Sequence, residues 1–276
     1  MGPIGVFDSG YGGLTILGEL LKKFPKYDFI YLGDNARSPY GNRSFEVVYK
    51  YTLEAVELLF NEGCHLVILA CNTASAKALR TIQQKNLPLL DPNRRVLGVI
   101  RPVSEVVGNY TKTRTIGILG TIGTILSNSY PLEIAKLFPD IKTVQEACPM
   151  WVPIVENNEI FSEGANYFVK KNIQSIFSRE PNIDTLILGC THYPLLLPVI
   201  EKNVEKNVQI LTSGKIVTDS LSNYLERHPE IEIKCSKTGI LKFFTTENPE
   251  KFNQTASLFL GRDVEGTKVE LPFLIK

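Results

Sequence analysis

The sequence has few of the residues that build disulfide frameworks and metal sites. Its 276 residues include five cysteines and three histidines. The cysteine count is odd, and neither a CxxC pair nor an HExxH motif occurs. These absences argue against a disulfide framework and against a zinc site, so we predict no bound metal. Unpaired thiols are typical of a reducing compartment, and we expect a cytoplasmic protein.

Long apolar runs and a surplus of one charge are also lacking. No apolar run approaches the ~18 residues of a membrane helix, and the segment before Asp8 lacks the basic and apolar regions of a signal peptide. Lysine and arginine number 30 against 29 aspartates and glutamates, a balance that gives no field to attract nucleic acid or an anionic membrane. We therefore expect a globular protein with a small-molecule substrate, and neither a membrane nor a nucleic-acid partner.

Short apolar runs alternate with helical patterns along most of the chain. The apolar runs predict strands near residues 4–7, 29–32, 66–70, 96–100, 115–119, 185–189, 208–211 and 241–244. The helical spacing predicts helices near residues 14–23, 45–61, 160–178 and 249–260, and an alanine-rich helix capped by Asn72 or Thr73. This alternation is typical of βαβ units, so we predict an α/β fold of mainly parallel sheets flanked by helices.

Two cysteines occupy matching places at the ends of predicted strands. Cys71 and Cys190 each follow an apolar run, in the segments Ala70-Cys71-Asn72-Thr73 and Gly189-Cys190-Thr191-His192. Open α/β sheets bind ligands at the carboxyl ends of their strands. A thiol at the start of the following helix can have its pKa lowered from about 8.5 into the range of about 3.5–7.5. The residues alone leave two interpretations open, a reactive thiol or a small buried hydrophobe.

The other candidate residues also allow a structural and a functional interpretation. The glycine-rich turn that begins at Asp8-Ser9-Gly10 could bind an anion through its backbone N–H groups, or it could be a tight strand-to-helix turn. Pro39-Tyr40-Gly41 is typical of a β-turn and could form a pocket wall. Thr121 and Thr124 could cap a helix or bind a carboxylate. The remaining cysteines, Cys64, Cys148 and Cys235, are interpreted as buried hydrophobes. The remaining histidines, His65 and His228, are interpreted as structural, and Glu156 as an ordinary surface acid.

Taken together, these motifs resemble the glutamate racemase family. Each motif alone is weak, but the ordered set is specific and covers essentially the whole chain. The motifs are Asp8-Ser9-Gly10 with Gly12-Gly13, Gly33-Asp34 with Pro39-Tyr40-Gly41, Cys71-Asn72-Thr73-Ala74, Leu119-Gly120-Thr121, Gly189-Cys190-Thr191-His192 and Thr212-Ser213-Gly214.

The resemblance implies a fold and an activity. It implies two similar α/β domains with the active site between them, the first of residues 1–98 and 210–276 with Cys71, the second of residues 99–209 with Cys190. It implies racemisation of L-glutamate to D-glutamate without a cofactor, which supplies bacterial peptidoglycan synthesis. It also implies a homodimer.

The resemblance further implies roles for individual residues. Cys71 and Cys190 would exchange the α-proton from opposite faces of the substrate. Asp8 would hold the substrate ammonium or help to activate Cys71, and His192, oriented by Glu156, would play the matching part beside Cys190. The residues that the resemblance places around the substrate are Asp8, Ser9, Pro39, Tyr40, Gly41, Asn72, Thr73, Thr121, Thr124, Thr191 and His192, with Asp34 and Glu156 supporting them.

Related enzymes and a non-catalytic protein are the alternatives. Aspartate racemases tend to carry glutamate after the second Cys-Thr, where this sequence has His192. A related decarboxylase keeps only one of the two cysteines. An anion-binding protein without catalysis could use the glycine-rich turn but would have no use for twin thiols.

Overall fold

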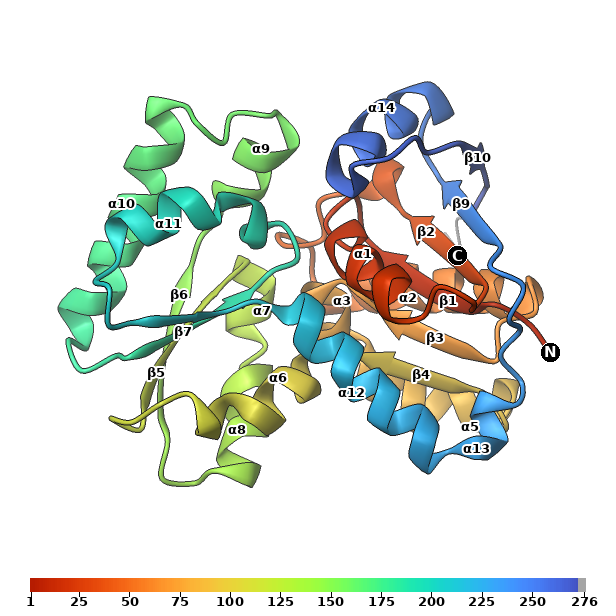
Figure 1. Ribbon diagram of the computed structural model, residues 1–276, viewed down its shortest axis with the longest axis horizontal. Coiled ribbons are helices and arrows are strands. Elements are labelled where there is room, and N and C mark those ends of the chain that lie inside the picture. Colours follow the sequence, from red (N-terminus) through yellow and green to blue (C-terminus); the bar gives the residue numbers. More distant parts are fainter. Residues whose placement is uncertain (273–276) are drawn as a thin grey trace.

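The computed structural model describes residues 1–272, which form two lobes, each built around its own sheet (Figure 1). Every strand pairing in both sheets is parallel. The predicted α/β fold of mainly parallel sheets flanked by helices is therefore confirmed. Residues 273–276, the end of the first predicted domain, lie outside the described residues.

The first lobe contains a six-stranded sheet in the order β10-β9-β2-β1-β3-β4. Its strands are β1 (Ile4–Asp8), β2 (Phe29–Gly33), β3 (Leu66–Leu69), β4 (Arg95–Gly98), β9 (Leu241–Thr245) and β10 (Gly266–Lys268). One face is covered by α1 (Leu14–Lys23), α12 (Ser213–Arg227) and α14 (Pro249–Leu260), and the other by α2 (Phe45–Asn61) and α3 (Asn72–Lys77).

The period-two alternation of side chains divides the core of this lobe into two layers. In β1, Ile4 and Val6 pack against the α1 side, while Phe7 packs against the α2 side. In β2, Ile30 and Leu32 join Phe7 on that second side. A central parallel strand buries both faces, which is why these strands are continuous apolar runs in the sequence.

The second lobe contains a four-stranded sheet in the order β6-β5-β7-β8. Its strands are β5 (Thr115–Gly120), β6 (Lys142–Ala147), β7 (Thr185–Gly189) and β8 (Gln209–Leu211). The helices α6 (Ile100–Val106) and α8 (Ser129–Leu137) cover one face, and α9 (Trp151–Glu156), α10 (Glu163–Arg179) and α11 (Leu197–Asn203) cover the other.

The chain crosses between the lobes twice. It leaves the first lobe between β4 and α6, and it returns between β8 and α12. The predicted boundary of the second domain lies after residue 209. Strand β8 pairs with β7 of the second sheet as far as Leu211, two residues beyond that boundary. The division into residues 1–98 with 210–276 and 99–209 stays a prediction, and the sheets favour a return two residues later.

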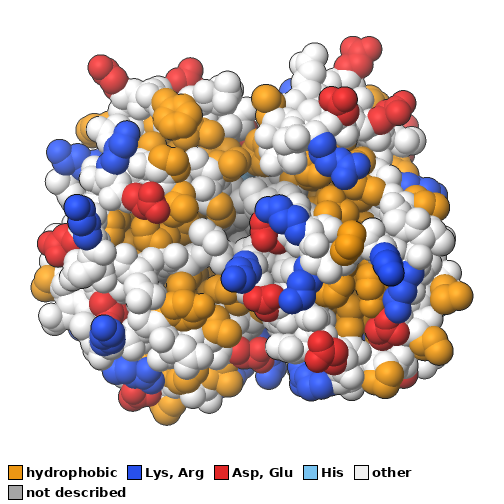
Figure 2. Space-filling model, viewed as in Figure 1, with side chains coloured by type: hydrophobic (Ala, Val, Ile, Leu, Met, Phe, Trp, Pro, Cys, Tyr) orange, Lys and Arg blue, Asp and Glu red, His pale blue; other side chains and the backbone are white. Residues whose placement is uncertain are grey.

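On the face of the molecule shown in Figure 2, lysine and arginine side chains lie among aspartate and glutamate side chains. Neither positive nor negative charge forms a large patch on this face. This distribution agrees with a net charge of +1. Within residues 1–272, none of the helices has the length and apolar content that crossing a bilayer requires.

Candidate active site

The two strand-end cysteines line one small cavity between the lobes. Cys71 follows β3 of the first lobe, and Cys190 follows β7 of the second. The cavity volume is about 60 Å³, and the two side chains are 5% and 6% exposed. The residues that line it are Ser9, Ser38, Pro39, Tyr40, Gly41, Asn42, Cys71, Asn72, Thr73, Thr121, Ile122, Cys148, Pro149, Val152, Pro153, Cys190, Thr191 and His192.

Cys71 caps the helix that follows it. Its sulfur accepts a hydrogen bond from the backbone N–H of Ala74 at 3.4 Å and lies 3.4 Å from the hydroxyl oxygen of Ser9. The prediction that Asn72 or Thr73 caps this helix is therefore wrong. Those two residues are already helical, which turns their side chains toward the cleft instead of toward the free N–H groups.

Burial opposes ionisation of Cys71 more strongly than the helix favours it. Burial, followed by the nearby charge of Asp8, raises the pKa of the Cys71 thiol to about 12, although the hydrogen bonds from Ser9 and Ala74 lower it. The expectation of a lowered thiol pKa is wrong for Cys71 in this closed arrangement. The thiolate loses more hydration in the sealed cavity than two hydrogen bonds replace.

Cys190 has a different neighbour. A 3₁₀ turn, Tyr193–Leu196, follows it instead of an α-helix. The Nδ1 atom of His192 lies 3.8 Å from the Cys190 sulfur, and Nε2 lies 3.0 Å from Oε1 of Glu156. Burial lowers the pKa of His192, but the contacts with Cys190 and Glu156 outweigh it and raise that pKa to about 10. These contacts favour the imidazolium form of His192, whose positive charge lies beside the Cys190 sulfur.

The two sulfurs thus face opposite charges. A carboxylate, Asp8, lies near Cys71, and an imidazolium, His192, lies beside Cys190. A negative charge on Cys190 also raises the pKa of Cys71. Because negative charges on the two sulfurs would repel each other, ionisation of both thiols at once is disfavoured. A thiolate with a thiol opposite it can accept a proton at one sulfur while the other sulfur donates one.

Asp8 lies beside the lining residues and is fully buried. The N–H of Gly10 donates to its Oδ2 at 2.9 Å, and the hydroxyl of Thr191 donates to its Oδ1 at 3.5 Å. Burial raises the pKa of the Asp8 carboxyl, and the charge of His192 lowers it in part. The contact with Thr191, which lies in the second lobe after β7, places Asp8 between the two lobes.

Three threonine hydroxyls meet across the cleft. Thr73 of the first lobe lies 2.9 Å from Thr121 and 3.4 Å from Thr124 of the second lobe, oxygen to oxygen, and those two lie 3.1 Å apart. Beside them, the amide nitrogen of Asn72 is buried and has no hydrogen-bond partner among residues 1–272. A cluster of hydroxyl groups beside an unpartnered amide donor, in a buried cleft, is suited to binding a carboxylate.

The loop with Pro39, Tyr40 and Gly41 lines the cavity from the first lobe. The Tyr40 hydroxyl donates to Asp34, which also accepts from Arg37 at 2.6 Å. Asp34 does not line the cavity and instead fixes the position of Tyr40. The structure therefore brings all the predicted site residues to one place, with Asp8, Asp34, Thr124 and Glu156 in contact with the lining residues.

Sequence reasoning missed some residues of this cleft. Cys148 lines the cavity beside Pro149, Val152 and Pro153. Cys148 follows β6, so the signal that singled out the other two cysteines applies here as well. Strand β6 was not predicted because it is a polar edge strand, Lys142–Ala147, whose residues are all at least partly exposed. Burial raises the pKa of Cys148 well above its ordinary value, so it is a neutral part of the cavity wall.

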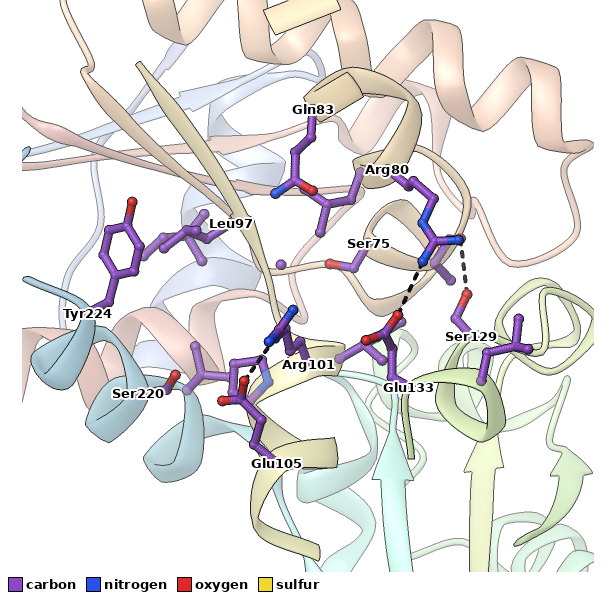
Figure 3. A pocket seen from close by; sticks show the side chains of 18 of the residues that line it. Ser75, Arg80, Gln83, Leu97, Arg101, Glu105, Ser129, Glu133, Ser220 and Tyr224 are labelled. Atoms are coloured by element: carbon purple, nitrogen blue, oxygen red, sulfur yellow. Dashed lines mark hydrogen bonds and ion pairs between the residues drawn. The ribbon is translucent and has the colours of Figure 1, made fainter. Parts of the chain in front are cut away.

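A second cavity is much larger but contains none of this chemistry. Its volume is about 800 Å³, and it lies between α3, β4, α6, α8 and α12 (Figure 3). Two of its arginines are already paired with carboxylates, Arg80 with Glu133 at 3.5 Å and Arg101 with Glu105 at 2.8 Å. Neither thiol lines it. The chemistry of the lining residues, and not the volume, therefore favours the smaller cavity as the candidate active site.

The fold and the cleft define a class of protein, a two-lobed α/β enzyme with one cysteine from each lobe facing a shared cavity. The comparison with known sequences agrees: a model of the Asp/Glu/hydantoin racemase family matches residues 19–221. The chain belongs to this family of isomerases.

Individual relatives narrow the comparison. The chain is 39% identical over 270 residues to a glutamate racemase of Sulfurihydrogenibium, covering 98% of this chain and 97% of the relative. It is similar to the crystal structure of glutamate racemase isoform RacE1 from Bacillus anthracis, with a TM-score of 0.89, 36% identity and 98% coverage of both chains. A glutamate racemase from Francisella tularensis in complex with D-glutamate has a TM-score of 0.86 at 32% identity, again with 98% of both chains covered. The resemblance inferred from the sequence motifs is confirmed.

Proposed function

We propose that this protein interconverts L- and D-glutamate by moving the α-proton between the thiols of Cys71 and Cys190. The observation that carries this proposal is the meeting of the two sulfurs, from different lobes and with opposite charges beside them, in one cavity. The D-glutamate named in the Francisella tularensis complex supports glutamate as the substrate.

Two bases suit a racemisation better than one. The α-hydrogen must leave one face of the carbon, and a proton must arrive at the other, so a single base would have to move across the substrate. Here one thiolate removes the α-proton, which forms an S–H bond and leaves the electron pair on Cα. The thiol on the opposite face then protonates the carbanion and becomes the thiolate. The reverse reaction exchanges the two roles.

The cleft supplies the donors that stabilise the intermediate. Deprotonation at Cα places negative charge on the neighbouring carboxylate, so preformed donors aimed at its oxygens lower the barrier. We assign this binding to the Asn72 amide and to the hydroxyls of Thr73, Thr121 and Thr191. His192 stabilises the thiolate form of Cys190, and Asp8 binds the substrate ammonium, which carries the opposite charge.

Substrate entry requires the lobes to separate. A cavity of about 60 Å³ is far below the ~300 Å³ at which ligand pockets begin. Backbone contacts join the lobes in this closed form, among them the Gly123 N–H, which donates to the Gly41 carbonyl at 2.8 Å. We therefore propose that glutamate binds to an opened cleft and that closure removes water from the thiols.

The wider setting follows from the same activity. D-Glutamate made by this reaction would supply bacterial peptidoglycan synthesis. We propose a cytoplasmic enzyme, since the mechanism requires reduced thiols, and a homodimer, as the family resemblance implies. Sedimentation velocity at several concentrations tests the dimer.

Proton NMR in D₂O provides the test of function. The protein is incubated under reducing conditions with L-glutamate, or with L-aspartate as the control, and the optical rotation is followed in parallel. We expect the α-proton signal of glutamate to disappear and its rotation to decay to zero, with aspartate unchanged. Exchange of aspartate alone would move the substrate to the shorter amino acid, and no exchange of either would refute the proposed activity.

A further inference from the structure

Tyr130 contacts both of the strand ends that carry the cysteines. It lies in α8 of the second lobe, and its side chain is fully buried. Its hydroxyl donates to Oδ1 of Asn72 at 2.8 Å, and Asn72 directly follows Cys71. Its ring lies against Gly189, directly before Cys190, because a Cβ built on that glycine would be 3.1 Å from Cε2 of Tyr130.

The phenol also fixes the orientation of the Asn72 amide. An amide oxygen can only accept and the phenol O–H is the donor, so this bond requires the Oδ1 end of Asn72 to face Tyr130. The amide oxygen is thereby held, and the amide N–H₂ group is the end of Asn72 that has no partner. An unpartnered donor in a side chain that is 2% exposed and lines the cavity is ready for a ligand oxygen.

We propose that Tyr130 is a positioning residue of the racemisation: it sets the spacing of the two cysteine-bearing strand ends and aims the Asn72 amide at a substrate carboxylate. This inference rests on the proposed function. Tyr130 touches neither the cavity nor the reacting atoms, so it acts through Asn72 and Gly189.

The kinetic test compares Tyr130→Phe with a matched control. Tyr49 also donates to an asparagine, Oδ1 of Asn86 at 2.9 Å, within the first lobe and outside the cavity lining. We expect Tyr130→Phe to lower kcat/KM about ten- to a hundredfold, since a buried amide oxygen loses its donor. The factor must be equal in both directions, because enantiomers have equal free energy. Tyr49→Phe is expected to stay within about twofold of the unmodified protein.

A double variant separates positioning from a general structural role. If Tyr130 acts through Asn72, Tyr130→Phe in an Asn72→Ala background costs less than about twofold further. If the tyrosine only supports the fold, it costs the same factor in both backgrounds, and the proposal is overturned.

The reactivity of the two cysteines, measured without substrate, tests the role of Tyr130 independently of the proposed function. The rates at which iodoacetamide alkylates Cys71 and Cys190 are read by peptide mass spectrometry. Tyr130→Phe removes the hydrogen bond between Tyr130 and Asn72, which joins the two lobes, so we expect the alkylation rates of both cysteines to rise several-fold. Tyr49→Phe is expected to leave both rates unchanged. If the unmodified protein racemises glutamate and Tyr130→Phe matches Tyr49→Phe in turnover and alkylation, the role of Tyr130 is refuted and the function stands. If glutamate is not racemised but the alkylation rates rise, the function is refuted and the link through Tyr130 stands. If neither effect is seen, both are refuted.

Discussion

The Nε2 atom of His192 lies 3.0 Å from Oε1 of Glu156, and Nδ1 of the same ring lies 3.8 Å from the Cys190 sulfur. Glu156 is 24% exposed at its side chain, whereas His192 is 5% exposed. The carboxylate thus keeps contact with solvent while it holds a charge inside the cleft. This arrangement supplies a positive charge next to one of two otherwise similar thiols.

The ionisation of His192 can be measured directly. The chain has three histidines, so their ring resonances can be assigned by single substitutions. We expect His192 to stay protonated until the pH approaches its pKa of about 10, whereas burial lowers the pKa of His65 below its usual range. Glu156→Gln should lower the pKa of His192, and Glu230→Gln, which removes the exposed partner of His228, should leave it unchanged. A His192 resonance that titrates near pH 6.5 would contradict the assignment.

The same shift makes the stability of the protein depend on pH. The folded protein holds the His192 proton more tightly than the unfolded chain does, so its contribution is complete below an unfolded pKa of about 6.5. That contribution is lost as the pH rises from there through about 10. Urea midpoints should therefore fall over this range more steeply in the unmodified protein than in His192→Gln. Equal slopes would show that His192 is not charged in the fold.

Each thiol of the pair should be needed for racemisation. Cys71→Ser and Cys190→Ser are expected to reduce turnover by at least about a thousandfold, because a hydroxyl is far too weak an acid to replace either base. The remaining thiol can still remove a proton and return a solvent deuteron on its own face. In D₂O we therefore expect slow exchange of one enantiomer without loss of optical rotation. Cys235→Ala, a buried cysteine away from the cavity, is the control, and substantial racemisation by either serine variant would exclude the two-thiol mechanism.

The sequence predicted the strands whose residues are buried on both faces. The runs near 29–32, 115–119 and 185–189 match β2, β5 and β7 within one residue, and all residues of these strands are buried. The edge strands β6 and β10 carry polar residues and lack such runs, so hydrophobic pattern could not find them. The predicted helix near 160–178 begins at Glu163, because the Ser162 hydroxyl accepts from the Ala165 N–H and starts the helix there.

In the site, too, local sequence patterns predicted some features, while others depend on contacts between residues far apart in the chain. Cys71 and Cys190 were found because each follows an apolar run, which is local information. The raised pKa of Cys71 depends on Asp8 and on burial by the second lobe, and neither is encoded near Cys71 in the chain. Likewise, Glu156 looked like a surface acid because its contact with His192 spans 36 residues.

Removing the charge of Asp8 should make Cys71 easier to ionise. In Asp8→Asn the shape is kept and the Gly10 N–H keeps an acceptor, but the charge that raises the pKa of Cys71 is lost. Alkylation of Cys71 is expected to begin at lower pH, while glutamate turnover falls about ten- to a hundredfold through loss of ammonium binding. Asp28→Asn, a buried carboxylate bonded to Thr238, should change neither. Unchanged kinetics in Asp8→Asn would remove Asp8 from the site.

Arg37 should be needed for stability because it neutralises two buried carboxylates beneath the Tyr40 loop. It pairs with Asp34 at 2.6 Å and with Glu54, and all three side chains are less than 10% exposed. Arg37→Met leaves both carboxylates without their cation, so we expect a loss of about 3–5 kcal/mol in the free energy of unfolding by urea. Arg101→Met breaks an exposed pair with Glu105 and should cost less than about 1 kcal/mol. Equal losses in the two variants would mean that the buried network does not stabilise the loop. A loss confined to Arg37→Met would identify the unpaired charge of the two buried carboxylates as the cause.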